Sequence, residues 1–68
     1  MQLSARNQLP GIVEEVHLGG IMARVVVKVG EYTMESVITR QSAEDLGLKK
    51  GEAVVVVVKS TEVMIQRT

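Results

Sequence analysis

A run of five valines, Val54–Val58, places β-branched side chains on both faces of a single strand. A barrel built from a chain this short fills only one of those faces, so we expect the other face to pack against another subunit. The chain has 68 residues, and we expect residues 1–68 to form one small domain. At this size folding hides only about 60 % of the surface that the unfolded chain exposes, which makes a lone core marginal.

The composition leaves few other ways to stabilise such a small domain. The chain has no cysteine and one histidine, His17, so it lacks disulfides, thiolate ligands and the ligand set of a zinc site. We therefore expect no bound metal cation, and self-association remains as the route to stability. We interpret His17 as a solvated or interface residue, neither a ligand nor a catalytic base.

Charge and hydropathy restrict the partners of the chain. Eight basic and eight acidic residues cancel, which argues against a general nucleic-acid binder that neutralises phosphates. The first ten residues lack the apolar stretch of a signal peptide, and the apolar run at residues 53–58 is too short to span a bilayer. We expect a cytoplasmic protein without nucleic-acid or membrane partners.

Glycine-marked turns divide the first part of the chain into three expected strands. Pro10-Gly11 bends the first strand, Gly19-Gly20 is a strong hairpin signal, and Gly30-Glu31 marks a second turn. We expect strands at residues 3–9 and 12–18, as two arms of one bent strand, then at 21–29 and 32–39. In the second strand one face is expected to carry Ile21, Ala23, Val25, Val27 and Val29.

The hydrophobic period changes at "SAEDLGLKKG", residues 42–51. Ser42 is a suitable N-cap with Asp45 in the capping-box position, and acidic residues in the first turn suit the helix dipole. Gly47 is a suitable C′ residue, followed by Leu48 for the accompanying hydrophobic contact. We expect a short helix here, then strands at residues 53–59 and 63–67.

The expected order is three strands, a short helix and two strands. This order matches an all-β fold: a five-stranded, OB-fold-like Greek-key barrel with one short helix between strands three and four. An SH3-like small barrel is the main alternative, and it would not need this helix.

Hydrogen-bond donors gather at three points where expected elements begin or end. Ser4 and Arg6 lie in the first expected strand, near the start of the chain. Thr39 and Ser42 lie on either side of the strand-to-helix junction, and residues 59–61 (Lys-Ser-Thr) lie at the end of the fourth strand. None of these clusters contains a carboxylate. The oxygens of a tetrahedral dianion only accept hydrogen bonds, so a lining of donors is suited to a small oxyanion. Each cluster also has a simpler interpretation: a helix N-cap at Ser42, a surface charge at Arg6 and a solvated turn at residues 59–61.

Three longer stretches resemble the molbindins, the Mop-type molybdate-binding proteins, and the broader family of transport-associated OB domains. These stretches are "LSARNQLPGIVEEV", "TRQSAEDLGLKKGEAV" and "VVKSTEVMI", and they cover nearly the whole chain. The resemblance implies a protein that binds molybdate or tungstate, without an organic cofactor, for intracellular storage or homeostasis. It also implies a homohexamer, arranged as a trimer of dimers, with oxyanions held at subunit interfaces.

Carried over by position, the resemblance implies which residues hold the anion. The implied oxyanion site comprises Ser4, Ala5, Arg6, Thr39, Ser42, Lys59, Ser60 and Thr61. A second class of oxyanion site is placed at the turn formed by Gly19, Gly20 and Ile21.

Other functions fit the sequence less well. An OB-fold nucleic-acid binder uses stacking aromatic residues, whereas this chain has one tyrosine and no Phe or Trp. A purely structural assembly module is a further alternative. We expect no enzyme, because no nucleophile–base pair or acidic dyad stands out.

Overall fold

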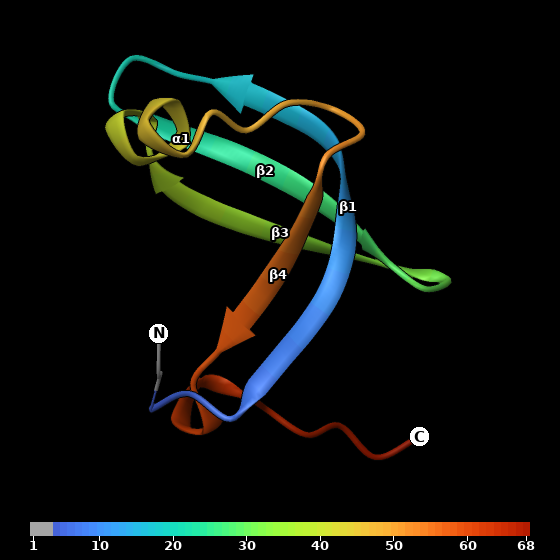
Figure 1. Cartoon of the computed structure of the whole chain (residues 1–68). Helices are drawn as coiled ribbons and strands as arrows, with labels where there is room; N and C mark the ends of the chain where they lie inside the picture. The colour runs from blue at the N-terminus through green and yellow to red at the C-terminus, as the bar shows by residue number, and fades with distance from the viewer. Residues whose placement is uncertain (1–3) are drawn as a thin grey trace.

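The computed structural model describes residues 4–68, which form an antiparallel sheet with one short helix and one 3-10 turn (Figure 1). The elements are β1 Asn7–Leu18, β2 Met22–Val29, β3 Tyr32–Thr39, α1 Arg40–Leu46, β4 Ala53–Val58 and η1 Ser60–Glu62. The predicted fold class is confirmed, with α1 between the third and fourth strands. Within the described residues the sheet has four strands instead of the five expected, in the order β3-β2-β1-β4.

The long strand β1 pairs with two different neighbours. Its first part, from Asn7 to Ile12, is antiparallel to β4, and its second part, from Ile12 to Leu18, is antiparallel to β2. The strand runs without a break through Pro10 and Gly11, so the two expected arms belong to one continuous, curved strand (Figure 1). The irregularity in pairing lies further along, as a register shift between Val13 and Glu15.

Gly11 lies where β1 passes very close to β2. A Cβ atom at this position would lie 2.7 Å from the carbonyl oxygen of Lys28 and 2.7 Å from a methyl group of Val27. Contacts this short would force the backbone or the neighbouring side chain to move, so the close approach of β1 to β2 requires glycine at this position.

We expect Gly11→Ala to lower the free energy of unfolding by about 1–3 kcal/mol, the usual effect of inserting a methyl group into filled space. Urea denaturation measures the change. Gly20→Ala is the matched control, because a Cβ atom there meets nothing within 4 Å. Equal destabilisation by the two substitutions would contradict the close approach.

The core is small and is built from valine. Val13, Val25 and Val27 are 1 %, 3 % and 4 % exposed, and aliphatic side chains from β3, β4 and the loop before β4 pack around them. The predicted inward face of β2 is confirmed for Ala23, Val25 and Val27. It is wrong for Ile21, which is 80 % exposed because β2 begins one residue later.

The helix begins and ends with hydrogen-bonded caps. Thr39, not Ser42, is the N-cap: its backbone is extended (φ −68°, ψ 148°) and its Oγ1 accepts the N–H of Ser42 at 3.1 Å. An N-cap needs an extended backbone, and Thr39, the last residue of β3, provides it. Consequently the acidic residues do not lie in the first turn.

The predicted end of the helix is confirmed. Gly47 has φ 62° and its N–H donates to the carbonyl of Glu44 at 3.0 Å, while the N–H of Leu48 donates to the carbonyl of Ala43 at 3.3 Å.

The expected fifth strand does not form within the chain. After η1, residues 63–68 have no regular structure and extend away from the sheet (Figure 1), with Met64 and Ile65 92 % and 90 % exposed. The sheet order leaves one edge of β3 and one edge of β4 without a partner strand in residues 4–68. An opening of about 400 Å³ lies between these strands and is lined by core side chains that include Val13, Val25, Val27, Ile38, Leu48, Val54 and Val56.

Candidate functional site

The residues of the predicted oxyanion site fall into two groups at opposite ends of β1. The first group, which we call the motif end, comprises Ser4–Arg6 just before β1 and Lys59–Thr61 just after β4. Cα pairing of Asn7 with Val58 brings these two segments together, and Figure 1 shows them side by side.

The second group, which we call the helix end, comprises Thr39 and Ser42 at the start of α1. Thr39 pairs with Met22, and the N–H of Arg40 donates to the carbonyl of Ile21 at 2.8 Å. The predicted second site, the turn at residues 19–21, therefore lies beside the helix end. The two ends are separated by β1, whose 12 residues correspond to a path of about 36–40 Å. One small ion cannot contact both ends of the same chain.

At the motif end, several acceptors are already occupied within the chain. The carbonyl of Ala5, a residue 9 % exposed, accepts from Nε2 of Gln8 at 3.2 Å. In η1, the carbonyl of Lys59 accepts the N–H of Glu62 at 2.9 Å, and that of Ser60 accepts the N–H of Val63 at 3.4 Å.

The side-chain donors of the motif end are exposed and have no partner among residues 4–68. The side chains concerned are those of Ser4, Arg6, Lys59, Ser60 and Thr61. Internal bonding of the carbonyls and exposure of the donors together leave a surface that can donate hydrogen bonds to an anion.

At the helix end, the two hydroxyl groups are bonded to each other. Thr39 Oγ1 donates to Ser42 Oγ at 2.8 Å while it accepts the Ser42 N–H. The single hydroxyl proton of Thr39 is therefore used, and the proton of Ser42 remains for an external acceptor. Thr39 acts here by positioning Ser42.

Arg40 is a residue of the helix end that the sequence reasoning missed. Its guanidinium donates to the carbonyl of Gly19 at 3.1 Å, and its Nε lies 3.7 Å from a carboxylate oxygen of Glu44. These contacts join α1 to the turn at residues 19–21. No spacing in the sequence indicates this contact, because it depends on how the β1–β2 turn meets the end of β3.

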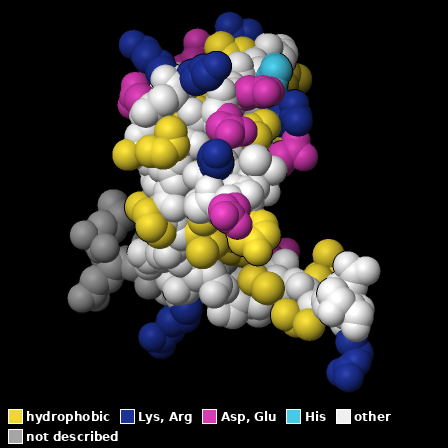
Figure 2. Space-filling model, turned by 90° about the vertical axis from the view of Figure 1, so that its right-hand side faces the viewer, with side chains coloured by type: hydrophobic (Ala, Val, Ile, Leu, Met, Phe, Trp, Pro, Cys, Tyr) yellow, Lys and Arg dark blue, Asp and Glu magenta, His cyan; other side chains and the backbone are white. Residues whose placement is uncertain are grey.

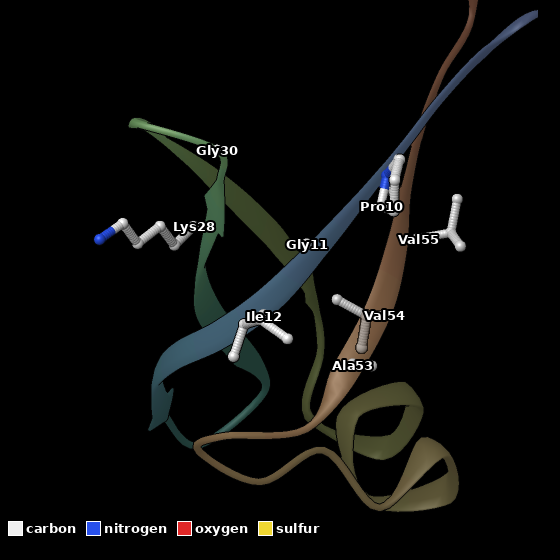
Figure 3. Close-up of a pocket in the computed structure, with 8 residues that line it drawn as sticks. All are labelled: Pro10, Gly11, Ile12, Lys28, Gly30, Ala53, Val54 and Val55. Atoms are coloured by element: carbon white, nitrogen blue, oxygen red, sulfur yellow. The ribbon is translucent and has the colours of Figure 1, made fainter.

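A shallow apolar groove lies elsewhere on the molecule and is not suited to an anion. It has a volume of about 690 Å³ and is formed where β1 crosses β4 and the end of β2. Figure 3 shows its lining residues, among which Lys28 alone is charged and extends away from the other side chains drawn. None of the predicted site residues lines this groove.

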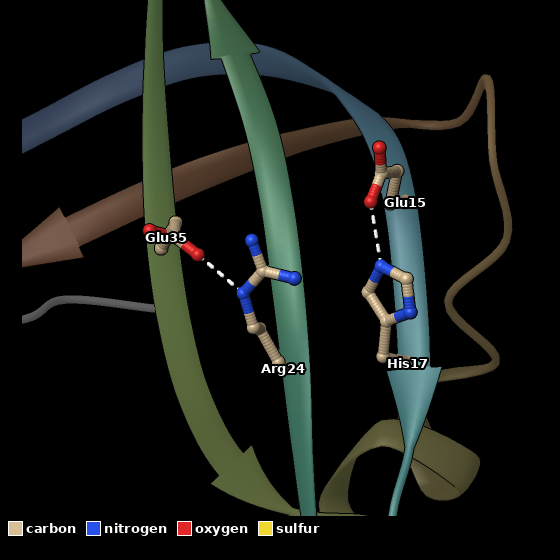
Figure 4. Close-up of polar contacts among 4 residues, drawn as sticks. All are labelled: Glu15, His17, Arg24 and Glu35. Carbon is tan, nitrogen blue, oxygen red and sulfur yellow. Dashed lines mark hydrogen bonds and ion pairs between the residues drawn. The ribbon is translucent and has the colours of Figure 1, made fainter.

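The outer face of β1, β2 and β3 carries charges of both signs. Arg24 is paired with Glu35, and His17 Nε2 lies 2.5 Å from a carboxylate oxygen of Glu15 (Figure 4). The hydrogen bond from His17 and its charge lower the pKa of the Glu15 carboxyl. Figure 2 likewise shows basic and acidic side chains intermixed on one part of the surface and hydrophobic patches on another. This face provides no concentration of positive charge for an anion, and His17 is exposed as expected.

Comparison with known families decides the assignment. The family model of the TOBE domain matches residues 3–65. The chain belongs to the TOBE-domain family. The resemblance to transport-associated OB domains is thereby confirmed, and the resemblance to molbindins is confirmed by the relatives and solved structures that follow. No helix of this TOBE domain, within residues 4–68, is long and apolar enough to cross a membrane.

Relatives of this TOBE domain include proteins of similar length. It is 47 % identical over 66 residues to "Molybdenum-pterin-binding protein 3" of Clostridium pasteurianum, covering 96 % of this chain and 97 % of the relative. It is also 42 % identical over 66 residues to "Molybdenum transport protein ModE" of Azotobacter vinelandii, where the match covers 96 % of this chain but only 24 % of the longer protein. These relatives are named as binding and transport proteins, not as enzymes.

Solved structures show the same fold. A molybdate-binding protein from Sporomusa ovata superimposes with a TM-score of 0.95 at 34 % identity, covering 98 % of this chain and all of the other. MopII from Clostridium pasteurianum gives a TM-score of 0.90 at 43 % identity, covering 97 % and 100 %.

Proposed function

We propose that this TOBE domain binds molybdate, with tungstate as an equivalent ligand, and stores or buffers it in the cytoplasm. The observation that carries the proposal is the motif end, where exposed donors surround carbonyl groups that are already hydrogen-bonded. The names of the relatives and of the similar solved structures, which refer to molybdenum or molybdate, support the choice of anion. The proposed role is binding without catalysis or an organic cofactor.

The chemistry of the motif end suits a tetrahedral dianion. Arg6 and Lys59 supply two positive charges, and the hydroxyl groups of Ser4, Ser60 and Thr61 supply neutral donors, with the backbone at Ala5 beside them. A desolvated dianion needs most of its lone pairs matched, because a buried charge that is poorly compensated is costly. Charge-assisted hydrogen bonds are about twice as strong as neutral ones, so the two cations carry most of the affinity.

The complete site requires two copies of the chain. Since the motif end and the helix end lie at opposite ends of β1, we place the motif end of one copy against the helix end of another. Ser42 of that second copy then donates its free hydroxyl proton, held in position by Thr39. The turn at residues 19–21, beside the helix end, is our proposed location for the second class of oxyanion site.

Self-association also completes the fold. The opening between β3 and β4 is lined by core valines, and residues 63–68 extend away with Val63 and Ile65 exposed. In the extended conformation that this segment would take against a second copy, these two residues would lie on the same side. We propose that this segment of a second copy covers the opening, and that the outer valines Val55 and Val57, 55 % and 44 % exposed, pack in a further interface of a homohexamer.

Selectivity among anions tests the proposed function. Phosphate is partly protonated near neutral pH, and its O–H would face donors only, so it should bind more weakly than molybdate. Sulfate is fully ionised but smaller, so it should leave some donors unmatched. Calorimetric titration with molybdate, tungstate, phosphate and sulfate measures the order of affinities. Phosphate binding as tightly as molybdate would show that the donor-only lining is wrong. Absence of binding by all four anions would favour the alternative that the protein is a purely structural assembly module.

A further inference from the structure

Gln8 is a residue outside the predicted site whose side chain acts on it. Its Nε2 donates to the carbonyl of Ala5 at 3.2 Å, across three residues at the start of β1. The backbone of Gln8 is held in place because it belongs to the strand ladder between β1 and β4, where Gln8 pairs with Val57. The side chain thus connects a regular strand to the irregular segment that carries Ser4 and Arg6.

This hydrogen bond fixes the orientation of one peptide group. In a planar trans peptide the carbonyl of Ala5 and the N–H of Arg6 point in opposite directions. A carbonyl directed toward Gln8 therefore turns the N–H of Arg6 away from Gln8, and the hydrogen bond favours this orientation of the peptide. Ala5 is 9 % exposed, so loss of the Gln8 donor would leave its carbonyl without that partner in a residue that is largely shielded from solvent.

We infer that Gln8 is a positioning residue that determines anion selectivity, by keeping the Ala5 carbonyl bonded and turned away from the ligand. This inference rests on the proposed oxyanion function. A carbonyl oxygen released from Gln8 repels a dianion, because both partners only accept hydrogen bonds. The same oxygen accepts a hydrogen bond from the O–H of a protonated anion. Loss of the Gln8 amide therefore weakens discrimination between molybdate and phosphate.

The test compares Gln8→Met with the unaltered protein in calorimetric titrations with molybdate and with phosphate. Methionine has a similar length and shape but no donor. We expect molybdate affinity to fall about 2- to 12-fold, the effect of one neutral hydrogen bond, with a smaller fall or a rise for phosphate. The ratio of molybdate affinity to phosphate affinity should therefore narrow. Gln41→Met is the matched control, because Gln41 also donates a hydrogen bond, to Asp45 within α1 at 2.9 Å. In this variant the ratio of molybdate to phosphate affinity should not change.

Two further variants separate positioning from a purely structural role. Gln8→Lys keeps a donor that can reach the Ala5 carbonyl. Its added charge should raise the affinity for both anions, so only the ratio of molybdate to phosphate affinity is compared, and that ratio should not narrow as it does in Gln8→Met. Gln8→Asn keeps an amide, but its side chain is too short to reach the Ala5 carbonyl, so the ratio of molybdate to phosphate affinity should narrow. This variant tests the inference if Gln8→Met does not fold. Light scattering verifies that each variant remains assembled.

The possible outcomes are distinct. Equal loss of molybdate and phosphate affinity in Gln8→Met, or no loss of either, would overturn the inference about Gln8 and leave the proposed function intact. Failure of the unaltered protein to bind molybdate would overturn both.

Discussion

Replacing Lys59 with alanine is expected to weaken molybdate binding about 10- to 150-fold. The substitution removes a charge-assisted hydrogen bond, which contributes about 1.5–3 kcal/mol, whereas Ser4→Ala removes a neutral donor worth about 0.5–1.5 kcal/mol. At about 1.4 kcal/mol per tenfold change, the serine substitution should weaken binding roughly 2- to 12-fold. Both residues are exposed, so neither substitution should unfold the chain. Calorimetric titration measures both effects.

Lys50→Ala is the matched control for charge, since Lys50 is an exposed lysine in the loop that precedes β4. It should leave molybdate affinity nearly unchanged. If Lys59 and Ser4 hold the same ion, their double substitution should depart from additivity. Normal molybdate binding by Lys59→Ala together with loss of the oligomer would mean that residues 59–61 form an interface turn instead of an anion site.

Replacing Ile65 with aspartate is expected to dissociate the oligomer and to destabilise the fold. Burial of one large aliphatic side chain contributes about 1.5–3 kcal/mol, and a charge placed in the opening between β3 and β4 adds an unpaired buried ion. Domains of this length have a total stability of only about 3–10 kcal/mol. Light scattering and urea denaturation should therefore show a smaller particle that unfolds at lower urea concentration.

Gln66→Asp introduces the same charge at the neighbouring position, on the opposite side of an extended segment. It should have a much smaller effect on assembly and stability. A stable, folded monomer of the Ile65→Asp variant, or of the unaltered chain at micromolar concentration, would show that residues 63–68 do not complete a second copy.

Local patterns in the sequence predicted most of the strands and one helix end. Alternation in β2 identified Ala23, Val25 and Val27 as core residues, and the single glycine after the helix identified its end at Gly47. The helix start was wrong because Thr39 and Ser42 both carry a hydroxyl group. The choice between them depends on backbone extension at the end of β3, which residue types alone do not determine.

Features that depend on the arrangement of strands were harder to predict. Residues 63–65 are apolar, as in many strands, but a strand requires a neighbour, and none is available to them within the described chain. Similarly, the predicted site residues were grouped by their chemistry, while the sheet order places them at opposite ends of β1. Arg40 was missed because its contact with Gly19 follows from this topology. Gln8 was missed because its local contact with Ala5 depends on the backbone conformation just before β1.

We propose that the motif end of one copy and the helix end of another hold a single oxyanion. Mixed oligomers of Lys59→Ala and Ser42→Ala chains test this claim directly, because each variant retains one intact end. If the two ends come from different copies, random mixing should produce intact sites at about a quarter of the interfaces, and another quarter with both defects. Molybdate titration of the mixture should then recover a component with the affinity of the unaltered protein. A titration that shows only the two single-variant affinities would contradict the claim and place both ends of the site on one chain.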